Sequence, residues 1–84
     1  MIFSRKATIE DFNSENERWE EILHKDVRDA IHKNRNIRQY PGLIEYRKRT
    51  YCGIEEAKRV ITKYMSFIEA WEDFSNGKDV YVQY

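Results

Sequence analysis

Residues 44–58 have the sequence IEYRKRTYCGIEEAK, which predicts two helices joined by a sharp turn. We expect Gly53 to end the first helix in the left-handed conformation that glycine adopts easily just past a helix C-terminus. Glu55 and Glu56 would then lie in the first turn of the next helix, where the helix dipole favours negative charge. Ala57 is small enough to let the two helices approach closely. A helical hairpin is therefore the expected centre of the fold.

On the C-terminal side of the turn, apolar residues recur every three or four positions, as in an amphipathic helix. They are Ile54, Ala57, Ile61, Tyr64, Met65, Ile68 and Trp71. This spacing predicts a helix over residues 54–74, closed by Asn76 and Gly77. The tail at 79–84 alternates and is rich in Val and Tyr, which is typical of a strand. A lone strand is unstable in water, so it must pair with residues 2–3, with a second copy or with a partner.

On the N-terminal side, Pro41 suits the first turn of a helix over residues 41–51. Before it, Ser14 and Glu17 match the capping-box pattern that begins many helices. The apolar residues after this box keep a helical spacing, and they predict one long helix over residues 15–33. The expected fold is therefore α+β and mostly α, a single domain over residues 1–84. It comprises three helices, among them the hairpin, and one or two short terminal strands.

The hairpin sequence resembles the C-terminal domain of the bacterial ribosomal stalk protein over residues 37–65. That family has a helix, a Thr-Gly-Leu-Gly-Leu turn and then Lys-Glu-Ala-Lys at the start of the next helix. The matching positions are Thr50, Gly53, Glu56, Ala57 and Lys58. Tyr51 and Cys52 replace the first Gly-Leu of the turn, and the flanks do not match.

The resemblance implies a surface that binds translation factors through basic residues. The family's arginine three residues before the turn threonine falls on Arg47, and the last lysine of its Lys-Glu-Ala-Lys falls on Lys58. A further lysine of that surface falls on Ile44, where this chain departs from the pattern. The chain is also similar in composition to small phage-encoded regulators, which implies an inhibitor that acts on a host factor.

The chain has zero formal net charge, but its charges are unevenly distributed along the sequence. Residues 1–32 contain five Lys or Arg and eight Asp or Glu, and residues 64–84 contain one and four. The middle, residues 33–63, contains nine Lys or Arg and only three Glu. A basic segment of this kind attracts polyanions in a salt-dependent way.

The basic side chains of this middle segment are interleaved with Tyr40, Tyr46, Tyr51 and Tyr64. The candidate binding residues are eight of these basic residues and one of the tyrosines. They are Arg35, Arg38, Arg47, Lys48, Arg49, Lys58, Arg59, Lys63 and Tyr46. Arginine pairs bidentately with phosphate, and tyrosine offers a face on which an unpaired base can stack. The alternative is a solvated helix surface balanced by the acidic ends.

Other side chains predict no catalytic, metal or cofactor site. His24 and His32 are eight residues apart on one expected helix and do not converge as metal ligands do. Cys52 lacks a partner base, and the aromatic series Tyr64, Phe67, Trp71 and Phe74 is typical of a core. No apolar run approaches the roughly 18 residues of a membrane span. We expect a cytoplasmic protein, or one in the host cytoplasm if a phage encodes it.

These features together predict a non-enzymatic regulator or inhibitor. It would bind RNA, or an RNA-handling host protein, through the basic hairpin. The alternative is a protein-interaction module that grips an acidic partner such as a translation factor. A homodimer is one of the ways to pair the C-terminal strand.

Overall fold

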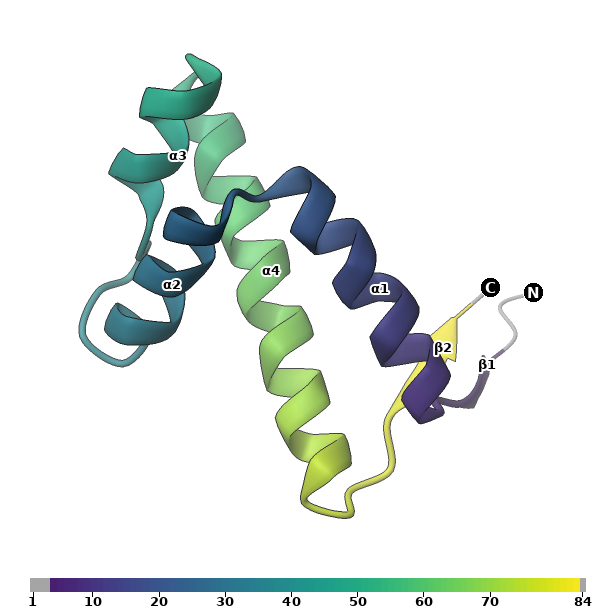
Figure 1. Cartoon of the computed structure of the whole chain (residues 1–84). Coiled ribbons are helices and arrows are strands. Elements are labelled where there is room, and N and C mark those ends of the chain that lie inside the picture. Colours follow the sequence, from purple (N-terminus) through teal and green to yellow (C-terminus); the bar gives the residue numbers. More distant parts are fainter. Residues whose placement is uncertain (1–3, 84) are drawn as a thin grey trace.

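Four helices and a two-stranded antiparallel sheet make up the computed structural model over residues 4–83, the part of the chain it describes (Figure 1). In chain order they are β1 (Ser4–Lys6), α1 (Ile9–Ile22), α2 (Lys25–Asn34), α3 (Leu43–Thr50), α4 (Ile54–Ser75) and β2 (Tyr81–Gln83). The expected class, α+β and mostly α, is confirmed.

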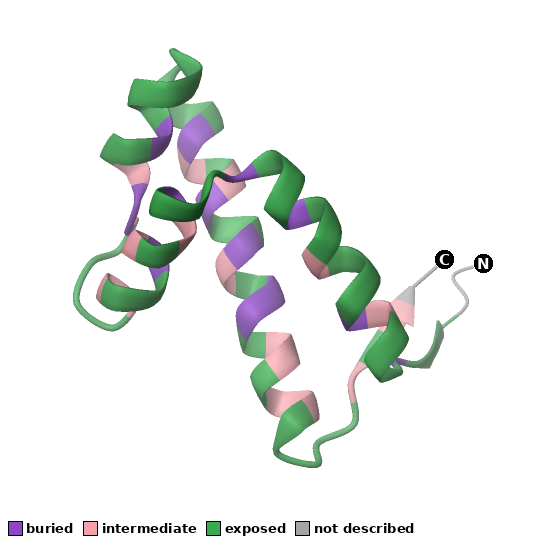
Figure 2. Ribbon diagram, viewed as in Figure 1, coloured by how far each residue is buried: buried purple, intermediate pink, exposed green. Residues whose placement is uncertain are grey.

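The long helix α4 is the element on which the others pack, and it follows the predicted apolar spacing. Its buried residues are Ala57, Ile61, Tyr64, Phe67 and Ile68. In the view of Figure 1, α4 runs between α1 on one side and α2 and α3 on the other. Figure 2 shows that the buried positions lie where these helices face one another. No helix among the described residues is both long and apolar enough to cross a membrane.

The prediction of one helix over residues 15–33 is wrong, because the chain turns a corner between α1 and α2. Leu23 leaves helical geometry, with φ −111° and ψ 123°, and its side chain is completely buried. His24 then caps α2 by accepting a hydrogen bond from the backbone N–H of Asp26. The corner lets both helices direct an apolar face at α4, which one straight helix could not do.

The start of α1 also differs from the prediction, since the helix begins six residues before the expected position. Thr8 is the N-cap, and its backbone N–H donates to Asp11 Oδ2 over 2.7 Å. Arg5 binds the same carboxylate through both terminal nitrogens, at 2.6 and 2.7 Å. Hydrogen bonds from Arg5 and Thr8 lower the pKa of Asp11. Ser14, the expected cap, is an exposed residue inside the helix.

The hairpin between α3 and α4 lies where the sequence predicted it, but its glycine does not have the predicted role. Gly53 has φ −67°, a value open to any residue, and a Cβ atom there would meet nothing within 4 Å. The left-handed residue is Tyr51, at φ 55°. At the other end of α3, Gly42 has φ 80° and follows the buried Pro41.

The C-terminal segment forms a strand, as predicted, and pairs within the chain. Ser4 lies opposite Gln83 and Lys6 opposite Tyr81, beside the start of α1 (Figure 1). The backbone N–H of Ala7 extends this pairing by donating to the Val80 carbonyl over 2.7 Å. Residues 2–3, the expected partner, lie outside the described residues. The backbone hydrogen bonds along this edge of β2 are made with β1, so the strand needs no second copy of the protein on this edge.

Aromatic side chains fill the space between α1 and α4. The Phe12 ring lies 5.8 Å from that of Trp71 and 4.9 Å from that of Phe74. Trp19 meets Tyr64 edge-on at 5.2 Å. Such contacts are worth roughly 0.5–1.5 kcal/mol each beyond the area they bury. The aromatic series is therefore part of the core, as its spacing predicted.

Candidate anion-binding interface

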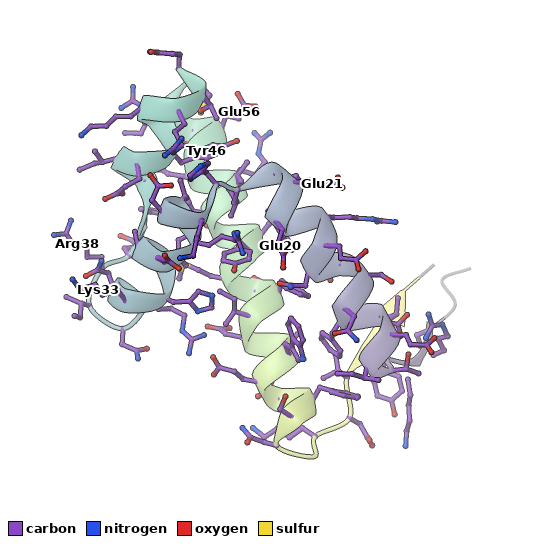
Figure 3. The ribbon with its side chains drawn as sticks, in the orientation of Figure 1. Glu20, Glu21, Lys33, Arg38, Tyr46 and Glu56 are labelled. Atoms are coloured by element: carbon purple, nitrogen blue, oxygen red, sulfur yellow. The ribbon has the colours of Figure 1, made fainter. Side chains whose placement is uncertain are left out.

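One side of α3 carries a face that combines basic and apolar side chains. Ile44, Arg47, Lys48 and Tyr51 recur at three- and four-residue steps, so they lie on one side of the helix. Tyr46 points to the opposite side, where α3 contacts α2 and α4 (Figure 3). This exposed face lines a shallow hollow of about 390 Å³, and Leu43 and Cys52 complete its lining.

Two further hollows continue this surface. A hollow of about 240 Å³ shares Leu43 and Ile44 with the first and adds Arg38. A third, of about 360 Å³, shares Tyr40 with the second and is lined by Lys58, Arg59 and Lys63. Figure 3 shows Arg38, on the loop between α2 and α3, directed away from the bundle.

We name this surface the basic track. It consists of the three hollows and their six basic side chains, Arg38, Arg47, Lys48, Lys58, Arg59 and Lys63. Adjacent hollows share lining residues, so the three are neighbours on the surface between α3 and the start of α4. Glu45 and Glu55 also line the track and reduce its positive charge.

The contacts of two track residues show how their charges are held. Lys58 lies 3.7 Å from a Glu55 carboxylate oxygen, and its ammonium sits 5.2 Å from the centre of the Tyr40 ring. Arg47 donates through Nε to the Cys52 carbonyl over 3.4 Å, which uses one of the five N–H donors of its guanidinium. Both charges remain at the surface of the hollows.

Two predicted binding residues, Arg35 and Arg49, form ion pairs between elements and do not line the track. Arg35 pairs with Glu72 and so joins the end of α2 to α4. Its hydrogen bond to Glu72 raises the pKa of Arg35 and lowers that of the glutamate. Arg49 binds Asp26 Oδ2 through two nitrogens, at 2.5 and 3.2 Å, and so ties α3 to α2.

The structure places Tyr46 in the core, with 8% of the residue exposed. Burial raises the pKa of its hydroxyl. The expectation that the Tyr46 ring is available for stacking is therefore wrong. Tyr64 is buried as well, with its hydroxyl 3.2 Å from His32 Nε2. The tyrosines that line the track are Tyr40 and Tyr51.

The Asp26–Arg49 pair gives a pH-dependent prediction. The hydrogen bond from Arg49 lowers the pKa of Asp26 from 3.8 to about 2. A depressed pKa stabilises the folded state above the unfolded value, and this contribution is lost as the pH falls through the folded value. We expect Asp26→Asn to lower the melting temperature near pH 5, with the difference from wild type disappearing toward about pH 2.

Thermal unfolding followed by circular dichroism at several pH values measures this difference. The matched control is Asp29→Asn on the same helix. Its carboxylate lies 3.8 Å from Lys25 of the same helix. A difference between Asp26→Asn and wild type that persists undiminished at pH 2 would contradict the assignment.

Neither histidine lines the track, although both lie in α2 or at its N-cap. His24 caps α2, and His32 contacts Tyr64. The Thr50 hydroxyl lies 3.1 Å from Cys52 Sγ, at the edge of the first hollow. Among the residues that the structure describes, no group of three or more His, Cys, Asp or Glu side chains could hold a metal ion.

The prediction of site residues omitted Tyr51, the most exposed large hydrophobic side chain that borders the first hollow. A signal for it is present in the sequence, because Ile44, Arg47 and Tyr51 share one helical face while Tyr46 lies on the other. Comparison of the chain with protein-family models, curated proteins and solved structures finds no match.

Proposed function

We propose that the protein is a non-enzymatic regulator that binds RNA through the basic track. The observation that carries this proposal is the continuity of three hollows that share lining residues and carry six basic side chains. Lys and Arg on such a surface release counterions from a phosphate backbone, which supplies most of the affinity. Tyr40 and Tyr51 add ring faces on which unpaired bases can stack.

The shape of the track favours a flexible single strand over a rigid duplex. Its hollows are lined by α3, by the loop between α2 and α3, and by the N-terminal half of α4. A single strand can follow such a path because its backbone rotates freely between bases. Sequence-specific recognition of RNA also acts mainly on unpaired segments.

The test is a titration of a short, fluorescently labelled single-stranded RNA at two salt concentrations. If each of the six cations neutralises one phosphate, the logarithmic salt slope is about −4, from about −0.7 per phosphate on single strands. Affinity then falls roughly 300-fold between about 50 and 200 mM salt. We expect Arg47→Glu with Lys58→Glu to weaken binding at least tenfold and to flatten the slope by about 1.4.

The matched control is Arg18→Glu with Lys25→Glu, which makes the same change in net charge outside the track. Both residues are exposed. RNA binding by this control should stay within a few-fold of wild type. Equal losses in the two double variants would show that net charge alone attracts the RNA. Absence of wild-type binding at low salt, with the protein folded, would remove RNA as the ligand.

A second candidate partner is an acidic protein surface, such as that of a translation factor. Ile44 and Ile54 are 58% and 45% exposed near the basic side chains, and protein interfaces use such apolar groups more than RNA does. The resemblance to the ribosomal stalk family implies the same partner, with Arg47 and Lys58 in contact. For that partner, the Arg47→Glu, Lys58→Glu variant should mainly slow association.

A further inference from the structure

The backbone at Tyr51 adopts a conformation that a tyrosine does not favour. With φ 55° and ψ 23° it is the one residue other than glycine with positive φ among residues 4–83. Its N–H donates to the Arg47 carbonyl over 2.9 Å, which closes the last turn of α3. Helices often end in this way, but glycine usually occupies the position because it has no Cβ to strain.

Packing of the Tyr51 side chain does not offset this strain. The residue is 90% exposed and is not among the core residues or those packed against them. Two residues later, Gly53 has an ordinary φ and open space around it. The chain therefore has a glycine where none is required and a tyrosine where glycine would be less strained. Strained residues of this kind are found preferentially at functional sites.

The surroundings of Tyr51 indicate which ligand its ring would take. Arg47 and Lys48 line the same hollow, together with the apolar side chains of Leu43 and Ile44. The Arg47 guanidinium is held at the Cys52 carbonyl, next to the Tyr51 backbone. An exposed ring beside two cations can stack with a base while the cations bind the adjacent phosphates.

We propose that Tyr51 is the stacking platform for one unpaired base, so that the ligand must be single-stranded at the first hollow. This inference rests on the proposed RNA binding and narrows it. In a duplex the bases are already stacked on one another and are not available to a protein ring. The basic track would then supply electrostatic affinity for the phosphate backbone, and Tyr51 would add to the preference for unpaired segments.

The test compares Tyr51→Gly, Tyr51→Asn and Tyr51→Phe with wild type on two RNAs that have the same number of phosphates. One RNA is single-stranded and the other is a duplex. Stacking of one base corresponds to a factor of roughly 5–150 in affinity. Tyr51→Gly and Tyr51→Asn should lose about that factor on the single strand and less than about twofold on the duplex. Tyr51→Phe, which keeps the ring, should retain the affinity for the single strand.

A second measurement tests the strain directly. Glycine relieves the left-handed conformation, so Tyr51→Gly should raise the melting temperature by about 4 °C, while Tyr51→Phe leaves it unchanged. A lower melting temperature for Tyr51→Gly would show that the side chain supports the fold, and would overturn the inference.

The binding data separate the inference from the proposal on which it rests. Undiminished single-strand binding by Tyr51→Gly, or equal losses on both RNAs, would overturn the stacking role and leave RNA binding by the track intact. Failure of the wild-type protein to bind either RNA at low salt would overturn both.

Discussion

Replacing Gly42 with alanine is expected to lower the free energy of unfolding by about 2–5 kcal/mol. Two costs combine at this position. The backbone has φ 80°, which an L side chain rarely adopts. A Cβ atom would also meet Ile31 Cγ1 at 2.8 Å and the Val27 carbonyl oxygen at 3.1 Å. Neither neighbour can move readily, since Ile31 is fully buried and the Val27 carbonyl belongs to the α2 backbone.

The other two glycines separate these costs. Gly77 has φ 84° but open space around its Cα, so Gly77→Ala should show the strain alone, about 1–2 kcal/mol. Gly53→Ala has neither cost and should be neutral or slightly stabilising, because alanine reduces the entropy of the unfolded chain. Urea unfolding of the three variants gives the order of stability. If Gly42→Ala were no worse than Gly77→Ala, the close approach of α2 to the start of α3 would not exist as described.

The effect of Gly42 was not predictable from the sequence, while the helix that organises the fold was. The apolar spacing over residues 54–74 predicts α4 almost to its ends, because one strongly periodic face can bury itself in only one way. The requirement for glycine at residue 42 arises from α2, which is separated from it by a loop. Such a requirement follows from packing between elements and has no local pattern.

The start of α1 shows a choice that local sequence leaves open. Ser14 with Glu17 and Thr8 with Asp11 both match a capping pattern, and the local sequence does not distinguish between them. Tertiary contacts select the second, because Arg5 binds Asp11 and β1 pairs with β2 just before the helix. Both contacts join segments that the sequence alone does not place together.

For the candidate site, the sequence predicted which segment carries the positive charge. It did not predict which basic side chains form ion pairs within the protein and which line the track. Six of the nine Lys and Arg residues of 33–63 line three neighbouring hollows. Only the structure distinguishes Arg35 and Arg49, which pair with carboxylates of other helices, from Arg38 and Lys48, which line the track. Ion pairs between helices depend on packing angles, which helical spacing does not determine.

Replacing Leu23 with alanine is expected to cost about 2–5 kcal/mol of unfolding free energy. Leu23 is completely buried at the corner between α1 and α2, so truncation leaves a cavity in the core. Its backbone N–H donates to the Trp19 carbonyl and its own carbonyl accepts from Arg28 Nε, and alanine keeps both bonds. The loss therefore measures side-chain packing at the corner. A domain of this size has a free energy of unfolding of only about 5–10 kcal/mol, so the variant should lose a large part of its stability.

The preceding residue provides the matched control. Ile22 is 54% exposed at the end of α1, and Ile22→Ala removes a side chain of the same size. We expect this variant to change stability by no more than about 0.5 kcal/mol, as is usual for surface positions. Urea unfolding of both proteins, with the m-value checked for a constant unfolded state, gives the comparison. Equal losses at residues 22 and 23 would mean that the corner does not bury Leu23 selectively, and the arrangement of α2 across α4 would then need to be revised.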